Sequence, residues 1–121
     1  MKKPLLIMLL CACSAPDFTG IWSGALTANT SAACGGSKTD AVRWTIRQAD
    51  ALEITPDTGT CGVLRADVAG RAAELRAKAC PNGTAFTGGT LELSTPERLS
   101  VRLTYTDGSC TATVKGTLDL E

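Results

Sequence analysis

The chain has 121 residues, of which 44% are hydrophobic, 20% charged and 4% aromatic, so its length supports one domain rather than two. Twelve Lys and Arg residues balance twelve Asp and Glu residues, and the zero net charge gives no electrostatic case for a nucleic-acid partner. The sequence contains no histidine, which excludes Ser-His and Cys-His nucleophile pairs, histidine general bases and histidine metal ligands. Six cysteines in so short a chain indicate an oxidising compartment or a metal site.

The N-terminal segment has the pattern of a secretory signal. Two lysines precede an apolar run that is too short to span a bilayer, since a spanning helix needs about 20 apolar residues. The run ends at Leu10-Cys11-Ala12-Cys13, which resembles the lipobox of bacterial lipoproteins. The resemblance implies cleavage before Cys13 and a lipid anchor on that cysteine. Lipidation of Cys11 and ordinary cleavage after Ala15 are the alternatives.

This signal predicts three segments: a lipoprotein signal peptide at 1–12, a short lipid tether at 13–17 and a folded domain at 18–121. Ser14 follows the lipid cysteine at the position where aspartate favours inner-membrane retention, so the resemblance implies an outer-membrane lipoprotein that faces the periplasm. The tether residues after the cysteine reach roughly 15 Å when fully extended. The domain is therefore expected to lie close to the membrane surface.

The rest of the chain alternates apolar and polar residues with a period of two, as at Val42, Trp44 and Ile46, and this period is typical of half-buried β-strands. An even number of antiparallel strands allows the last strand to pair with the first, which removes both sheet edges. We therefore expect an all-β fold, a small up-and-down antiparallel β-barrel of about eight strands. The predicted strands lie near 21–28, 41–48, 51–55, 60–68, 71–79, 84–94, 98–106 and 110–120.

Two of these strands have alternative interpretations. The segment 71–80 is rich in alanine, which favours helix, but its apolar residues alternate with charged ones, so we expect a strand. Gly88-Gly89 could turn a hairpin that divides 84–94. We expect a β-bulge there, because an undivided strand keeps the strand number even.

The interior of the predicted barrel contains many small residues, which leave either a cavity or a collapsed lumen. On the last strand, the residues expected to face inward include Leu118 and Leu120. The small residues expected to face inward are Ala66, Ala73, Ala77, Ala112 and Gly116.

Four cysteines follow the lipobox, at Cys34, Cys61, Cys80 and Cys110, and they lack the close C-x2-C pairs of a structural zinc site. We therefore expect disulfides, no metal and no cofactor. In an up-and-down barrel all four lie at the same end. Cys61 and Cys80 flank one hairpin, and Cys110 begins the strand that closes beside the one ending before Cys34. This arrangement predicts Cys61–Cys80 and Cys34–Cys110, and the alternative is Cys34–Cys61 with Cys80–Cys110.

The start of the first strand carries a family resemblance. Asp17-Phe18-Thr19-Gly20-Ile21-Trp22 resembles the G-x-W signature of calycin barrels, which include lipocalins and avidins. The resemblance implies that Trp22 packs across the barrel floor. Biotin binding is not expected, because an avidin-like site needs several tryptophans and the chain has two.

Other short motifs have plain structural explanations. Asp57 and Asp107 lie beside glycines but lack the ligand rhythm of a calcium loop. Arg43, Arg47 and Arg102 are expected on outward faces, where a solvated sheet explains them better than a site for anionic lipid or polysaccharide.

Three classes of function remain open at this stage. We favour a non-catalytic envelope lipoprotein whose barrel binds a small apolar ligand or an envelope partner close to the membrane surface. The alternative is an inhibitor of a periplasmic hydrolase, a protease or a lysozyme, that acts through the 29–40 loop. An enzyme is disfavoured, because the sequence has no recognisable nucleophile, base or metal constellation. An apolar cavity of about 300 Å³ or more would support ligand binding.

Overall fold

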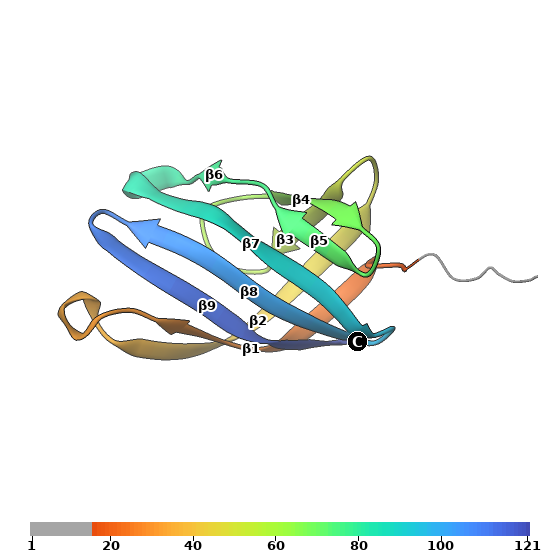
Figure 1. The fold of residues 1–121 in the computed structure, drawn as a ribbon, viewed down its shortest axis with the longest axis horizontal. Coiled ribbons are helices and arrows are strands. Elements are labelled where there is room, and N and C mark those ends of the chain that lie inside the picture. The colour runs from red at the N-terminus through yellow and green to blue at the C-terminus, as the bar shows by residue number, and fades with distance from the viewer. Residues whose placement is uncertain (1–15) are drawn as a thin grey trace, which may run out of the picture.

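The computed structural model describes residues 16–121, which form a closed antiparallel β-barrel (Figure 1). The predicted signal peptide and the lipidation site Cys13 lie outside the described residues. No helix within residues 16–121 is long and apolar enough to cross a membrane. The strands are β1 (Gly20–Asn29), β2 (Ser37–Gln48), β3 (Leu52–Pro56), β4 (Leu64–Ala69), β5 (Ala72–Leu75), β6 (Lys78–Ala79), β7 (Thr84–Thr95), β8 (Arg98–Asp107) and β9 (Cys110–Leu120), with short 3-10 turns η2 (Ala32–Cys34) and η3 (Pro81–Gly83).

The barrel closes as expected from the strand pattern. The sheet order is β5-β4-β3-β2-β1-β9-β8-β7-β6, so strands that follow one another in the chain also pair in space, and the last strand β9 pairs with the first strand β1. β5 and β6 both pair with β7 and together fill one position in the barrel wall. The nine labelled strands therefore make an eight-stranded, up-and-down barrel.

Both ambiguous segments have the predicted structure. The alanine-rich segment forms β5 and β6, because its alternation places Ala73 and Leu75 in the core. β7 is undivided, and its register against β8 shifts between Phe86 and Gly88, which is the predicted bulge. Gly89 next to it has φ +146°, and a Cβ there would lie 2.4 Å from the carbonyl oxygen of Arg102. Glycine is therefore required at this close approach.

Four sequence-based expectations about strand limits and faces are wrong. The strand expected at 60–68 begins only at Leu64, because residues 57–63 form a loop between β3 and β4. Ala77 is exposed and lies between β5 and β6 rather than inside the barrel. Leu120 is 36% exposed, since it ends β9 beyond the core. The expected 29–40 loop is shorter in the structure and covers only residues 30–36, because β1 and β2 pair as far as Asn29 and Ser37.

One end of the barrel, the floor end, is closed by aromatic side chains. Trp22 is fully buried there, and its indole Nε1 donates a hydrogen bond of 2.9 Å to the carbonyl oxygen of Phe18. Phe18 is also fully buried, and its N–H donates to Gln48 Oε1 at 3.1 Å. The buried aliphatic residues of the core include Ile46, Leu52, Ile54, Leu91, Leu93, Leu99, Val101 and Leu118.

The opposite end, the mouth end, carries both disulfides. The predicted pairing is confirmed: Cys34 bonds to Cys110 and Cys61 bonds to Cys80, with Cα–Cα distances of 5.8 and 4.7 Å. Both bridges join segments that leave the barrel wall at the mouth. They therefore hold the part of the molecule that has the fewest strand neighbours.

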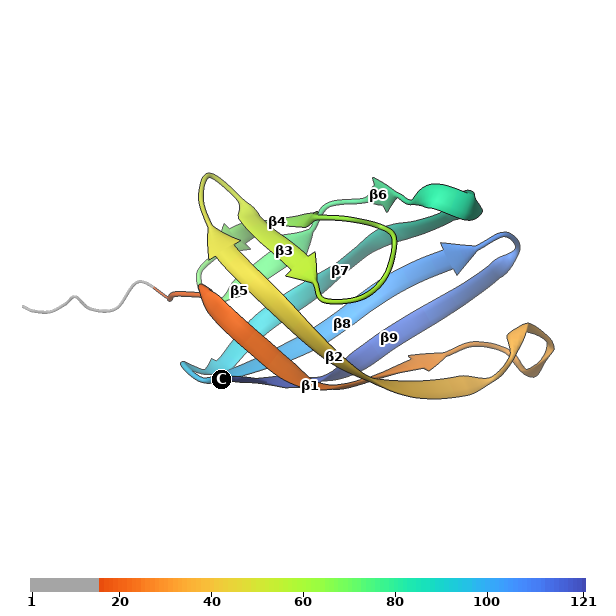
Figure 2. The same ribbon diagram turned by 180° about the vertical axis from the view of Figure 1, so that it is seen from behind.

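The hairpin of β1 and β2 extends at the mouth end as an arm, here residues 25–42 (Figure 2). Its tip is a tight turn in which Thr30 N donates to the carbonyl oxygen of Gly36 at 3.1 Å. Side-chain bonds join the two strands at Thr27 and Thr39, 2.8 Å apart, and at Ser37 and Asn29, 2.6 Å apart. The tip is attached to β9 through Cys34–Cys110.

Candidate ligand-binding cavity

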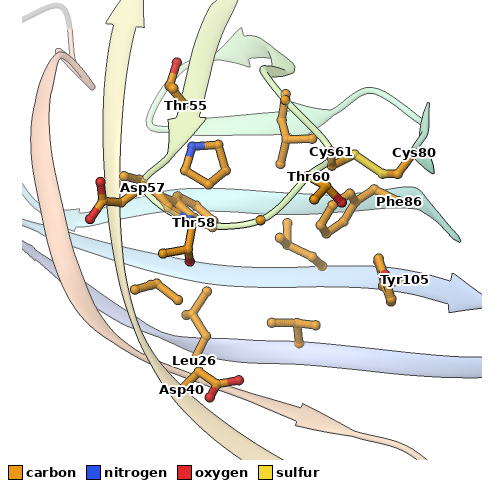
Figure 3. A pocket seen from close by; sticks show the side chains of 18 of the residues that line it. Leu26, Asp40, Thr55, Asp57, Thr58, Thr60, Cys61, Cys80, Phe86 and Tyr105 are labelled. Atoms are coloured by element: carbon orange, nitrogen blue, oxygen red, sulfur yellow. A yellow bond between two sulfur atoms is a disulfide. The ribbon is translucent and has the colours of Figure 1, made fainter. Parts of the chain in front are cut away.

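A cavity of about 470 Å³ lies in the mouth half of the barrel (Figure 3). The arm, the mouth ends of β7, β8 and β9, and the loop 57–63 surround it. The floor half of the barrel is filled by fully buried side chains such as Trp22 and Phe18, whereas partly buried side chains such as Val114 and Phe86 line the open space in the mouth half.

The inner wall of the cavity is apolar because strand alternation points every second side chain inward. Leu26, Trp44 and Leu103 are buried at its base. Val42, Val114 and Phe86 are partly buried and pack against the core while lining the open space. This wall excludes water from a ligand but offers it no buried polar partner, since no polar or charged residue is buried within residues 16–121.

Two aromatic rings form one side of the wall. Phe86 of β7 and Tyr105 of β8 face each other with their ring centroids 5.0 Å apart and their planes at 61°. This edge-to-face arrangement is a favoured aromatic geometry and fixes both rings. Aromatic walls suit ligands with flat or flexible apolar groups, which gain dispersion contacts on entering.

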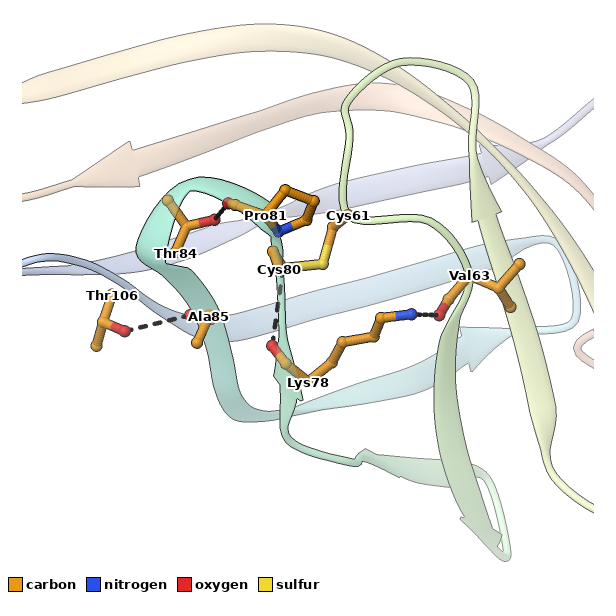
Figure 4. Close-up of a disulfide and its surroundings, with 8 residues drawn as sticks. All are labelled: Cys61, Val63, Lys78, Cys80, Pro81, Thr84, Ala85 and Thr106. Carbon is orange, nitrogen blue, oxygen red and sulfur yellow. Dashed lines mark hydrogen bonds between the residues drawn. A yellow bond between two sulfur atoms is a disulfide. The ribbon is translucent and has the colours of Figure 1, made fainter.

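The loop 57–63, here the cover loop, connects β3 to β4 at the mouth end. It closes the side of the cavity between β2 and β6, where the barrel wall has no strand. Its first residue, Asp57, donates its N–H to the carbonyl oxygen of Arg43 at 2.8 Å. At the other end Lys78 Nζ donates to the carbonyl oxygen of Val63 at 3.0 Å, and Cys61–Cys80 joins the loop to the end of β6 (Figure 4). Three separate attachments therefore hold a segment that has no strand pairing.

Polar residues lie at the rim of the cavity. Lys38 and Asp40 come from the inner face of the arm, with Nζ and Oδ2 3.9 Å apart and side chains that are 78% and 63% exposed. Asp57, Thr58 and Thr60 come from the cover loop. A ligand with an apolar body and one polar end would place that end at this rim.

A second hollow of about 500 Å³ lies at the floor end and differs in its lining. All but one of its residues are polar or charged, the exception being Leu120. It offers no apolar wall, so the mouth cavity is the better candidate for a ligand site.

The outer wall carries paired charges. Arg43 bonds to Glu121 and Arg47 to Glu53, so these two arginines contact carboxylates rather than forming an unpaired basic patch. Hydrogen bonds from arginine hold the pKa of three carboxyls on the outer surface below their ordinary values: Glu53 beside Arg47, Asp67 beside Arg76, and Glu121 beside Arg43.

Sequence reasoning placed the disulfides correctly and missed the cover loop. The two aspartates beside glycines lie apart, Asp57 in the cover loop and Asp107 at the end of β8. No group of three or more metal-ligating side chains occurs within the described part of the chain. The signal for the loop was present in Thr58-Gly59-Thr60-Cys61-Gly62, where two glycines interrupt the alternation. Both adopt positive φ, +105° at Gly59 and +79° at Gly62.

Comparison of the chain with protein-family models, with curated proteins and with solved structures gives no match. The functional argument therefore rests on the geometry of the barrel and on the sequence.

Proposed function

We propose that this chain is a non-catalytic envelope lipoprotein whose barrel binds a small apolar ligand in the mouth cavity. The observation that carries the proposal is the apolar cavity of about 470 Å³, a size within the range of roughly 300–1,000 Å³ typical of small-molecule sites. It is also above the minimum of about 300 Å³ that we set for a cavity able to support ligand binding. The lipobox-like Leu10-Cys11-Ala12-Cys13 supports lipidation of Cys13 and a place at the outer membrane, facing the periplasm.

The ligand site is tested by filling the cavity. Val114→Trp places an indole in the cavity, whereas Lys115→Trp puts the same side chain on the exposed outer face of β9. The full chain is titrated with the apolar fluorescent probe N-phenyl-1-naphthylamine. We expect saturable binding that weakens at least about tenfold in Val114→Trp and is unchanged in Lys115→Trp. Equal binding by both variants, with folding verified by circular dichroism, would overturn the proposal.

The envelope assignment is tested on protein extracted from the membranes of a bacterium that processes lipoproteins. Intact-mass spectrometry is expected to show loss of residues 1–12 and a diacylglyceryl and acyl addition on Cys13. Native mass spectrometry of the same sample would reveal a ligand that remains bound. An unmodified chain that retains its initiator methionine would contradict the anchor without affecting the cavity.

A second candidate function is inhibition of a periplasmic hydrolase, a protease or a lysozyme. The observation in its favour is the arm, a hairpin whose tip is attached to β9 by Cys34–Cys110. Such a constrained element suits insertion into an active site, because little flexibility is lost on binding. Ala33→Arg at the exposed tip would abolish inhibition and leave probe binding unchanged. Absence of inhibition in the unaltered chain would exclude this candidate.

A further inference from the structure

The arm leaves one edge of β2 without a neighbouring strand. β3 pairs with β2 only from Trp44 to Gln48, whereas β1 pairs with β2 along the whole arm. Residues 37–42 therefore have a strand on one side only, and both ribbon views show β2 at the outer margin of the arm (Figures 1 and 2). An unpaired edge of this kind is a template for another strand.

The free backbone groups of this edge can be identified. Asp57 N donates to the carbonyl oxygen of Arg43, so Arg43 directs its backbone groups away from β1. Antiparallel pairing alternates this direction, so Ala41, Thr39 and Ser37 also direct their N–H and C=O groups outward. All three residues are exposed, and no turn, loop or side chain in residues 16–121 bonds to these groups. The edge offers three donors and three acceptors.

The side chains between them carry opposite charges. Lys38 and Asp40 lie two residues apart on the same face of β2, and both are exposed. Lysine and inward-pointing charges on an edge strand usually oppose pairing, and Lys38 and Asp40 are of this kind, so a partner strand has to place a counter-charge opposite each of them. An antiparallel second copy of this chain meets that condition, because the spacing of two residues places each lysine opposite an aspartate of the other copy.

We propose that two copies of this chain pair through the β2 edges of their arms, antiparallel and about a two-fold axis at Thr39. In this register Thr39 faces Thr39 of the second copy, and Ser37 faces Ala41 of the second copy. These are the hydrogen-bonded pairs, since their backbone groups point outward. Lys38 then faces Asp40 of the second copy, twice by symmetry, in the non-hydrogen-bonded pairs where side chains approach most closely.

Pairing of the arms also changes the cavity. Lys38 and Asp40 belong to the cavity rim, so each copy adds a lysine and an aspartate to the rim of the other. The two cavities then open beside the same interface. This inference does not depend on the identity of a ligand, because the edge and its charges are present in the unliganded chain.

Charge reversal tests the pairing. The full chain, in density-matched detergent, is examined by sedimentation equilibrium over a wide range of protein concentration. Lys38→Asp and Asp40→Lys each convert two attractive pairs into two repulsive ones, and we expect the dimer to weaken roughly thirtyfold. The double variant Lys38→Asp/Asp40→Lys restores both attractive pairs and is expected to dimerise like the unaltered chain. Lys115→Asp, on the outer face of β9, serves as the matched control and should have no effect.

Hydrogen exchange provides an independent readout of the same edge. The amides of Ser37, Thr39 and Ala41 should exchange more slowly as the concentration of the unaltered chain rises, and this protection should be lost in Lys38→Asp. A chain that is monomeric at all concentrations would overturn the proposal. So would a dimer that both single reversals leave unchanged, or a double variant that fails to recover. None of these outcomes decides whether the cavity binds the apolar probe, so failure of the pairing and failure of the proposed function can be distinguished.

Discussion

The two disulfides provide a quantitative test of what stabilises the barrel. Cys34–Cys110 closes a segment with a sequence separation of 76, and Cys61–Cys80 closes one with a separation of 19. The chain-entropy relation converts these separations into about 4.5 kcal/mol for the first bridge and about 3.2 kcal/mol for the second at 25 °C. Cys34→Ala/Cys110→Ala should therefore lower the free energy of unfolding by about 1 kcal/mol more than Cys61→Ala/Cys80→Ala does.

The assay is equilibrium unfolding of the full chain in urea, followed by tryptophan fluorescence. Trp22 and Trp44 are both buried, so their emission reports loss of the core. Ligand binding separates the two bridges further. Loss of Cys61–Cys80 frees the cover loop and should weaken binding of the apolar probe, whereas loss of Cys34–Cys110 should affect stability much more than binding.

The reasoning would be refuted if the Cys61–Cys80 variant proved the less stable of the two. Contacts made by the cover loop in the folded barrel, rather than restriction of the unfolded chain, would then dominate the contribution of that bridge. Equal probe binding by both variants would show that the other two attachments of the loop suffice.

Three further predictions concern the barrel wall and floor. Gly116→Ala places a methyl group 2.3 Å from the carbonyl oxygen of Ala25, so β1 and β9 must separate. The free energy of unfolding should fall by about 1–3 kcal/mol, with a lower urea midpoint. Unchanged stability would contradict that close approach. Phe18→Ala should cost about 3–5 kcal/mol in the same assay, because it opens the floor, and a loss below about 1 kcal/mol would argue against a filled floor. The pKa of Glu53 is lower in the folded chain than its ordinary value of 4.5 because Arg47 bonds to it. Its stabilising contribution is therefore complete above about pH 4.5 and disappears as the pH falls through the lower, folded value, so Glu53→Gln should flatten the acid side of the stability profile; an identical acid limb in both proteins would refute this.

The strand arrangement could be predicted from the sequence because it depends on local alternation. The period of two at Val42, Trp44 and Ile46 fixes which face is buried, and the turn signals fix where each strand reverses. Closure of the barrel and the pairing of the cysteines then follow from the even strand number. These features need no knowledge of side-chain packing.

The cavity and the arm could not be predicted in the same way. Whether small inward residues leave a space depends on how large neighbours from other strands pack, and Ala66 and Ala73 lie in the filled core rather than beside the cavity. The outer part of the arm resembles a loop in the sequence, because residues 28–40 are small or polar and have no apolar alternation that would indicate a strand. The expectation that Ala77 faces inward is wrong for a related reason, since the apolar–polar alternation of the sequence continues beyond Leu75, where β5 ends.

The separation of the floor end from the mouth end sets an orientation for the whole molecule. The first described residues and the C-terminus both lie at the floor end, opposite the arm (Figure 1). If Cys13 carries the lipid that we propose, the few residues between it and Phe18 bring the floor end to the leaflet and turn the opening of the cavity toward the aqueous compartment. A ligand would then enter and leave the cavity through the aqueous compartment and would not pass directly between the cavity and the hydrocarbon layer of the membrane.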